Sequence, residues 1–308
     1  MKGLFDRRLI ILSGKGGVGK TTTAAALGLC ASQRGKRVLI AQTEAAERLG
    51  KMFGRREPIG PTIVRLGPNL DAVNMTPASS LHEYGLMVLR SEVIYRALFE
   101  NRAVRGFLSA IPGLDAYAML GKAWWHTTEE VQGRRRYDLV ILDGPASGHA
   151  VLMLRIPQAI LDTMPKGPLT RDALAARELL SDPVRTTLVI VTLPEELPVR
   201  EAIELGHTAR GSLALPLGLV VVNAVPSDAF SPPEVRAVLN QVLPPTGDAA
   251  LDATLRLAAG VRAHRFTAEQ MLARLRDDPG VPLLSFPRLP TIDLGPAEIA
   301  ILAAAIPG

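Results

Sequence analysis

The chain has 308 residues, of which 47% are apolar and 21% are charged, and its formal net charge is +5. This length and apolar content suffice for one large α/β domain, and no apolar run reaches the roughly 20 unbroken residues of a membrane span. Cys30 is the only cysteine, which excludes an internal disulfide and a zinc site built from paired thiolates of one chain.

The N-terminal segment, Met-Lys-Gly-Leu-Phe-Asp-Arg-Arg, leads directly into an expected strand. It leaves no room for the apolar stretch and the small-residue cleavage site of a signal peptide. We therefore expect the protein to stay in the cytoplasm.

Short β-branched runs alternate with longer helical patterns along the whole chain. This alternation is typical of parallel strands joined by crossover helices, and near-continuous apolar strands are expected where helices cover both faces of a sheet. The sequence therefore predicts an α/β fold with a mostly parallel, doubly wound sheet in one domain, residues 1–308. The expected strands are residues 8–12, 37–41, 70–74, 137–142, 187–192, 217–223 and 281–286.

Residues 76–132 carry no strand signal. Their pattern predicts three or four helices, broken at Asn101 and at Pro112-Gly113. We expect this segment to be a helical insertion within the single domain.

The first expected strand leads into residues 13–22, Ser-Gly-Lys-Gly-Gly-Val-Gly-Lys-Thr-Thr, and an alanine-rich helical pattern follows. Glycines let backbone N–H groups turn toward a phosphate, and a helix N-terminus adds partial positive charge. This phosphate loop predicts a P-loop NTPase, with Lys20 at the β- and γ-phosphates of ATP and the Thr21 hydroxyl on Mg²⁺. The predicted nucleotide-binding residues of the loop are Gly14, Lys15, Gly16, Gly17, Val18, Gly19, Lys20, Thr21 and Thr22.

Lys15 stands at a loop position where an ordinary phosphate loop requires no lysine. The loop resembles the deviant Walker A class. That resemblance implies that Lys15 reaches across a dimer interface to the partner's nucleotide and neutralises charge in the transition state. The alternative is an exposed, solvated lysine.

Residues 143–149, Asp-Gly-Pro-Ala-Ser-Gly-His, follow the strand expected at 137–142. They resemble the second switch of the ArsA and tail-anchored-protein-targeting ATPase family. Asp143 ends an apolar strand, where a carboxylate can hold the water shell of Mg²⁺, so Thr21 and Asp143 form the expected metal site. Pro145 and Gly148 lie in a loop that can sense the γ-phosphate.

Two later segments extend this resemblance over essentially the whole chain. Residues 191–201 match one family motif, and their acids Glu195, Glu196 and Glu201 suit the start of a helix, where capping and active roles both stay open. Asn223 ends the strand expected at 217–223, and the resemblance implies that it reads the adenine edge. Residues 287–290 would then lie near the base.

The first switch departs from the family pattern. Where the family has Asp-Pro-Ala-His, this chain places Glu44 at the aspartate position and lacks the proline and the histidine. The extra methylene moves the carboxylate by about 1 Å or more, which can cost about a hundredfold in rate. We therefore expect slow hydrolysis. Either Glu44 still orients water, or the carboxylate comes from elsewhere, including a paralogous partner.

The family's zinc-binding cysteine pair and its metalloid-binding cysteines are absent, so we expect neither zinc nor an arsenical pump subunit. The resemblance also implies that the insertion can hold an apolar client helix or membrane protein. Methionine and tryptophan suit such adaptable surfaces, but the same side chains at helical spacing also fit packing on the sheet. The residues in question are Leu86, Met87, Leu89, Ile94, Leu98, Phe107, Leu108, Met119, Leu120, Trp124 and Trp125.

The function predicted from these motifs is an ATPase that acts as a nucleotide-switched dimer, either a homodimer or a heterodimer with a related ATPase. A regulatory pseudo-ATPase subunit is one alternative. A ParA-like DNA-binding ATPase is another, whose binding would fall steeply with salt. Nucleic acid is not the expected partner, because the basic residues are scattered apart from Arg134, Arg135 and Arg136. The residues of the DNA-binding alternative are Arg262, Arg265, Arg274 and Arg276.

Overall fold

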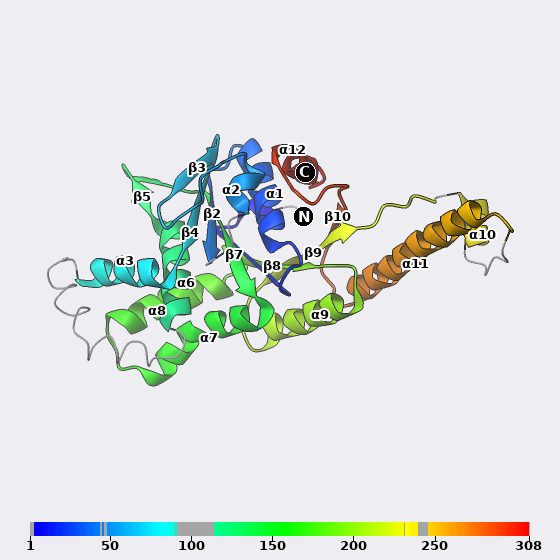
Figure 1. Ribbon diagram of the computed structural model, residues 1–308. Helices are drawn as coiled ribbons and strands as arrows, with labels where there is room; N and C mark the ends of the chain where they lie inside the picture. The colour runs from blue at the N-terminus through cyan, green and yellow to red at the C-terminus, as the bar shows by residue number, and fades with distance from the viewer. Residues whose placement is uncertain are drawn as a thin grey trace.

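Parallel strands form most of an eight-stranded sheet at the centre of the computed structural model (Figure 1), which describes residues 3–43, 45, 48–89, 91, 114–230, 232–239 and 246–307. The strand order is β10-β9-β8-β1-β7-β2-β4-β3, and only β3 is antiparallel to its neighbour. The predicted α/β fold with a mostly parallel sheet is confirmed. The parallel strands are β1 (Leu9–Gly14), β2 (Val38–Thr43), β4 (Leu70–Met75), β7 (Leu139–Ala146), β8 (Thr186–Thr192), β9 (Leu217–Val225) and β10 (Leu283–Pro287).

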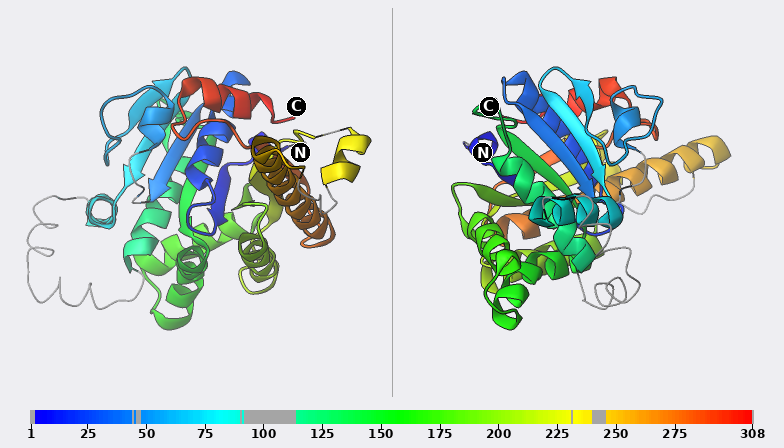
Figure 2. Two further views of the ribbon diagram at one scale, coloured as in Figure 1. Left: turned by 45° about the vertical axis from the view of Figure 1, so that its right-hand side comes forward. Right: turned by 90° about the vertical axis from the view of Figure 1, so that its left-hand side faces the viewer.

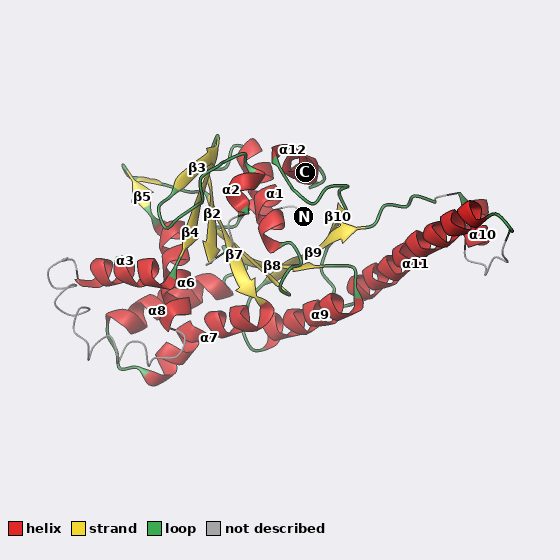
Figure 3. Ribbon diagram, viewed as in Figure 1, coloured by secondary structure: helices red, strands yellow, loops and turns green. Residues whose placement is uncertain are grey.

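Helices cover both faces of the sheet (Figure 3), so the central strands are buried on both sides. Alternate residues of β1 separate the two halves of the core: Ile10 and Leu12 face one layer, while Leu9 and Ile11 face the other. The first layer contains α1 (Lys20–Gln33), α2 (Leu49–Met52) and α12 (Pro296–Ala304). The second contains α6 (Leu114–Thr128), α7 (Ser147–Thr163), α8 (Pro168–Ser181) and α9 (Glu196–Gly211).

The strand β3 (Val64–Gly67) was not expected from the sequence. Its four residues are all at least partly exposed, so it lacks the apolar run that marks a buried strand. The expectation of no strand within residues 76–132 is also wrong at its end. There the short strand β5 (Glu130–Val131) pairs with β6 (Arg134–Arg135), and the turn between them has two positive φ angles, which is typical of a tight hairpin.

The predicted insertion is described at its two ends, where α3 (Pro77–Leu89) packs against α6. Met119 and Leu120 of α6 are buried against the sheet, which supports sheet packing for these two residues. Trp124 is partly buried there, whereas Trp125 is 38% exposed. The expected breaks at Asn101 and Pro112-Gly113, together with Ile94, Leu98, Phe107 and Leu108, lie outside the described residues, so the boundaries 76–132 stay a prediction.

Two helices between β9 and β10 form an arm that leaves the body of the molecule (Figures 1 and 2): α10 (Pro233–Leu239) and α11 (Ala249–Asp277). The side chain of Asp248 caps the start of α11 by accepting hydrogen bonds from the backbone N–H groups of Ala250 and Leu251. Near its other end, Leu272 and Leu275 are buried in the core. The C-terminal part of α11 is thus anchored, and its N-terminal part projects.

None of the helices in the described part of the chain combines the length and the apolar character that crossing a bilayer requires.

Candidate nucleotide site

The loop between β1 and α1 carries the predicted phosphate-binding residues, and two of its glycines lie too close to neighbouring strands for a side chain to fit unless an atom there moves. A Cβ atom on Gly14 would lie 2.0 Å from the Val191 carbonyl oxygen, and one on Gly19 would lie 2.1 Å from Asn223 Nδ2. Both glycines also have positive φ angles, 152° and 95°. The loop is therefore held tightly between β8 and β9, with its amides at the N-terminus of α1.

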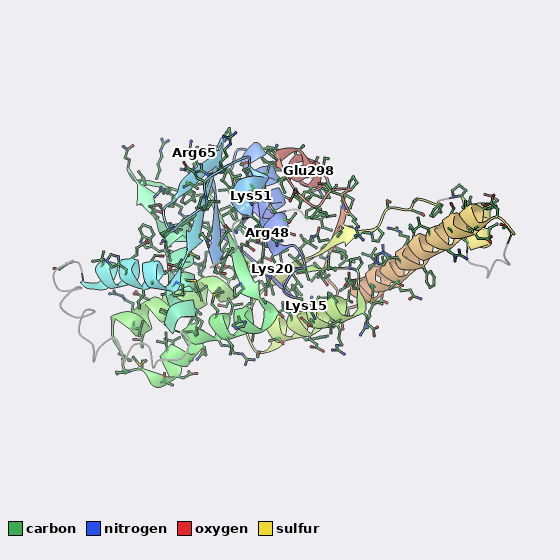
Figure 4. All side chains as sticks on the ribbon, in the orientation of Figure 1. Lys15, Lys20, Arg48, Lys51, Arg65 and Glu298 are labelled. Carbon is green, nitrogen blue, oxygen red and sulfur yellow. The ribbon has the colours of Figure 1, made fainter. Side chains whose placement is uncertain are left out.

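Lys20, labelled in Figure 4, is the first residue of α1, and its side chain contacts carbonyl oxygens of its own loop. Its Nζ lies 3.4 Å from the Gly14 carbonyl oxygen and 3.3 Å from the Lys15 carbonyl oxygen. Burial lowers the pKa of Lys20, and the negative charge of Asp143 opposes that shift. The ammonium group therefore lies inside the concave loop, where a phosphate has to bind.

Asp143, at the end of β7's buried run, meets Thr21 as the sequence predicted for a metal site. The Thr21 hydroxyl donates to Asp143 Oδ2 at 2.7 Å, and Gln42 Nε2 donates to the same oxygen at 3.1 Å. Burial raises the pKa of the Asp143 carboxyl, while these hydrogen bonds and the charge of Lys20 oppose the shift. The carboxylate is thereby held between the phosphate loop and the end of β2.

The other carboxylate oxygen, Asp143 Oδ1, is buried and has no hydrogen-bond partner within the described residues. A buried unpaired carboxylate oxygen is costly unless it binds a cation or water. Mg²⁺ takes oxygen ligands and keeps several waters, so a hydroxyl and a carboxylate at this distance suit it. The residues present therefore fit a magnesium ion next to the phosphates.

Gln42 and Thr43 are functional candidates that sequence reasoning did not single out. Gln42 pairs in register with Asp143 across β2 and β7, and the Thr43 hydroxyl donates to the Asp143 carbonyl oxygen at 3.1 Å. The carboxyl ends of neighbouring parallel strands meet at one edge of the sheet, but finding this pair requires the strand order. Glu44, the predicted switch carboxylate, lies outside the described residues.

Lys15 points toward α9 (Figure 4), and its Nζ lies 2.7 Å from Glu201 Oε1 of the same chain. Both side chains keep about a third of their surface exposed, at 32% and 29%. The helix α9 starts at Glu196, so Glu201 does not cap it. Instead, Glu201 forms an ion pair with Lys15 of the phosphate loop. Sequence reasoning named Glu201 but did not connect it to Lys15.

Asn223 lies beside the loop and beside a small cavity. Its Nδ2 donates to the Val18 carbonyl oxygen at 3.0 Å, so part of its hydrogen-bonding capacity fixes the loop itself. The cavity has a volume of about 210 Å³, and its lining includes Thr22, Pro287 and Leu289. The structure thus brings the predicted base-binding asparagine next to the segment after the last strand, as the sequence led us to expect.

Pro145 and Gly148, the predicted γ-phosphate sensors, lie where β7 ends and α7 begins. Gly148 is exposed, and a Cβ atom there would meet no atom within 4 Å. The first turn of α7 is therefore not tightly packed around Gly148.

The basic surface of the DNA-binding alternative is not formed as predicted. Arg262 is only 7% exposed, and Arg265 donates to the Pro226 carbonyl oxygen at 2.6 Å and to Glu269 at 2.9 Å. Only Arg274 and Arg276 of the four predicted arginines are exposed. Spacing along α11 could not reveal which of its sides faces the body.

Comparison with known proteins supports a nucleotide site. The family model described as anion-transporting ATPase matches residues 7–175, more than half of the chain. ATPase BagA of Mycobacterium tuberculosis is 27% identical over 312 residues, covering 94% of this chain and 89% of that protein. The arsenical pump-driving ATPase of Escherichia coli is 27% identical over 240 residues, 70% of this chain and 39% of that protein. ATPase ASNA1 homolog 1 of Paramecium tetraurelia is 30% identical over 148 residues, 48% of this chain and 43% of that protein.

Proposed function

Because this chain belongs to the anion-transporting ATPase family, we propose that it is an ATP-binding and ATP-hydrolysing dimeric switch whose nucleotide state controls a helical partner-binding region. The observation that carries this proposal is the meeting of Thr21 with Asp143 at 2.7 Å beside the loop that holds Lys20. The Thr21 hydroxyl and the Asp143 carboxylate can hold Mg²⁺, and the Lys20 ammonium group beside them can bind the phosphates of a triphosphate.

In this proposal the loop amides and Lys20 bind the phosphates, and Thr21 and Asp143 hold Mg²⁺. When bound, Mg²⁺ neutralises charge on the β- and γ-phosphates. Asn223 and the residues after β10 bind the adenine base. Pro145 and Gly148 lie two and five residues after Asp143, where β7 leads into α7, so the presence of a γ-phosphate changes the start of α7. In turn, α7 packs against α6 of the predicted insertion.

Calorimetry and hydrolysis assays on the purified full chain test this proposal. We expect ATP to bind with a heat of association that depends on Mg²⁺, and we expect slow phosphate release. Light scattering during size-exclusion chromatography should show an ATP-dependent dimer. A chain that gives no heat of association with ATP and Mg²⁺ is not an ATPase of this kind.

The pair between Lys15 and Glu201 supports a further part of the proposal, namely that Lys15 is held within its own chain until nucleotide and partner are present. Replacing Glu201 with glutamine is expected to tighten ATP-dependent association by up to about fivefold, because a partly exposed ion pair contributes about 0–1 kcal/mol. Analytical ultracentrifugation with ATP measures this change.

The matched control is Glu204→Gln, which removes an exposed carboxylate of the same helix whose nearest cation, Arg200, is 3.8 Å away. This control should leave association unchanged. If Glu201→Gln weakens association instead, Glu201 keeps its contact with Lys15 in the dimer, and the pair does not hold Lys15 back.

Glu44 decides between a slow ATPase and the alternative of a regulatory pseudo-ATPase in a heterodimer. The side chain of Asn74 forms two hydrogen bonds with the backbone of the next residue, Ala45. Asn74 Nδ2 donates to the Ala45 carbonyl oxygen at 3.0 Å, and the Ala45 N–H donates to Asn74 Oδ1 at 3.1 Å. These bonds fix the backbone one residue after the predicted switch carboxylate. We expect Glu44→Gln to lower turnover about a hundredfold without changing ATP affinity, as loss of a water-orienting base does.

Phosphate release under single-turnover conditions checks this expectation, with the exposed Glu57 replaced by glutamine as the control. Unchanged turnover in Glu44→Gln would remove Glu44 from the mechanism and favour a carboxylate supplied by a related partner subunit.

A further inference from the structure

A cleft lies between the projecting part of α11 and the body of the molecule, on the arm shown in Figure 2. Its volume is about 570 Å³, within the range of about 300–1,000 Å³ that is usual for small-molecule sites. Leu257 and Val261 line it on the helix side, and Pro226, Leu289 and Pro290 line it on the body side. The cleft thus has apolar walls from two separate parts of the chain.

A hydrogen bond between Arg265 and Pro226 joins α11 to the body next to this cleft. Arg265 Nη1 donates to the Pro226 carbonyl oxygen at 2.6 Å, while its Nε donates to Glu269 at 2.9 Å. The first bond ties the helix to the loop after β9 just beyond the cleft, and the second lies within α11 and holds the Arg265 side chain in place. Together with the buried anchor residues Leu272 and Leu275, they hold α11 in place while leaving the space beside Leu257 and Val261 open.

Three cationic or protonatable side chains surround the apolar walls: Arg256, His264 and Arg288. In the part of the chain that the structure describes, none of the three forms an ion pair with a carboxylate. The acid one turn before Arg256, Asp252, is bound by Thr246 through its N–H at 2.8 Å and its hydroxyl at 2.7 Å. Asp252 keeps its negative charge near Arg256, but it forms no direct ion pair with that arginine, so two arginines and a histidine leave the rim of the cleft with net positive charge.

Gly260 faces this cleft from within the 29-residue helix α11. Glycine inside a helix destabilises it relative to alanine, so such a glycine usually has a packing reason. Here a Cβ atom would meet no atom within 4 Å, so close packing does not explain it. Because Gly260 has no side chain, the α11 wall of the cleft stays open at this position.

We propose that this cleft binds a small anionic amphiphile, a molecule with an apolar chain or ring system and a single carboxylate, sulfonate or phosphate head. The apolar part would lie against Leu257, Val261 and Leu289, and the head would lie between Arg256, His264 and Arg288. Charge complementarity and the volume of the cleft, which suits a small molecule, favour this occupant over another protein chain. The proposal does not rest on ATP binding, because the cleft lies outside the phosphate loop.

Arg288 and Leu289 also line the small cavity beside Asn223, so substitutions in either residue would affect both places. The test therefore uses Gly260 and Arg256, which line the cleft alone. Gly260→Leu fills the open wall with a side chain that improves helix propensity. Arg256→Glu reverses the charge at the rim.

The experiment is calorimetric titration of the full chain with dodecyl phosphate, kept below its critical micelle concentration, and with dodecyltrimethylammonium under the same conditions. We expect one dodecyl phosphate to bind per chain, at least about tenfold more tightly than the cationic amphiphile, because Arg256 and Arg288 attract an anionic head and repel a cationic one. Gly260→Leu should weaken dodecyl phosphate binding at least tenfold while its melting temperature stays equal or rises. Arg256→Glu should weaken dodecyl phosphate and strengthen dodecyltrimethylammonium binding.

The matched control is Gly211→Leu, which fills open space at the end of α9 away from the cleft and should bind as the unmodified chain does. ATP titration of the same variants separates this proposal from the proposed ATPase function, because both glycine variants should bind ATP normally. Equal affinity for the two amphiphiles, or undiminished binding by both Gly260→Leu and Arg256→Glu, would overturn the proposal. So would the absence of dodecyl phosphate binding.

Discussion

Replacing Lys20 with alanine is expected to weaken ATP binding by about two to three orders of magnitude. The Lys20 ammonium group lies at the loop carbonyls of Gly14 and Lys15, where the β- and γ-phosphates are proposed to bind. A hydrogen bond to a charged group contributes about 1.5–3 kcal/mol, so the loss of two such bonds costs about 3–4 kcal/mol at the lower end of that range. Calorimetry with ATP and Mg²⁺ measures the loss.

The control for this substitution is Lys166→Ala, which removes an exposed lysine between α7 and α8. It changes the net charge by the same amount and should leave ATP affinity unchanged. Circular dichroism should show the same melting temperature for Lys20→Ala and the unmodified chain within a few degrees, because the two hydrogen bonds of Lys20 to loop carbonyl oxygens are long, at 3.3 and 3.4 Å. ATP binding by Lys20→Ala with unchanged affinity would contradict the proposed phosphate site.

Replacing Lys15 with alanine is expected to lower ATP turnover at least about a hundredfold while changing ATP affinity by no more than a few-fold. The reason is that Lys15 points away from its own loop toward Glu201, so once released from Glu201 it can serve a neighbouring subunit rather than its own nucleotide. A group that neutralises transition-state charge contributes about 10²–10³ in rate. Single-turnover phosphate release and calorimetry together separate rate from affinity.

Mixing the two lysine variants distinguishes action within one chain from action across a dimer. A Lys15→Ala chain binds ATP through its own Lys20, and a Lys20→Ala partner still carries Lys15. If Lys15 acts across the interface, the mixture should recover turnover at one of its two sites although neither variant alone is active. A mixture as inactive as its components would place Lys15 in its own site and remove the main reason to propose a dimer.

Local patterns in the sequence were sufficient for the fold class and for the phosphate loop. The central parallel strands are short apolar runs because helices bury both their faces, and all seven expected strands are present. The loop could be predicted because its glycines, Lys20 and Thr21 are consecutive between a strand and a helix. The elements that escaped prediction, β3 and the β5–β6 hairpin, are short and mostly exposed, so burial leaves no pattern in their sequence.

Contacts between distant segments were not predictable in the same way. Gln42 reaches Asp143 because β2 and β7 are neighbouring strands in the sheet and pair in register. The sequence of neither strand predicts which strand will be its neighbour. Arg262 looked like a surface arginine, yet it is buried, because the side of α11 that faces the body depends on how the arm is anchored.

The sequence by itself determined that this chain forms a parallel α/β sheet with a phosphate loop and a carboxylate at the end of a later strand. Those features follow from short-range periodicity and from consecutive residues. Only the tertiary structure decided that Lys15 pairs with Glu201, 186 residues further along the chain, and that α11 leaves an apolar, positively charged cleft beside the body. The physical reason is that ion pairs and clefts depend on the distance between segments, which strand order and helix packing set.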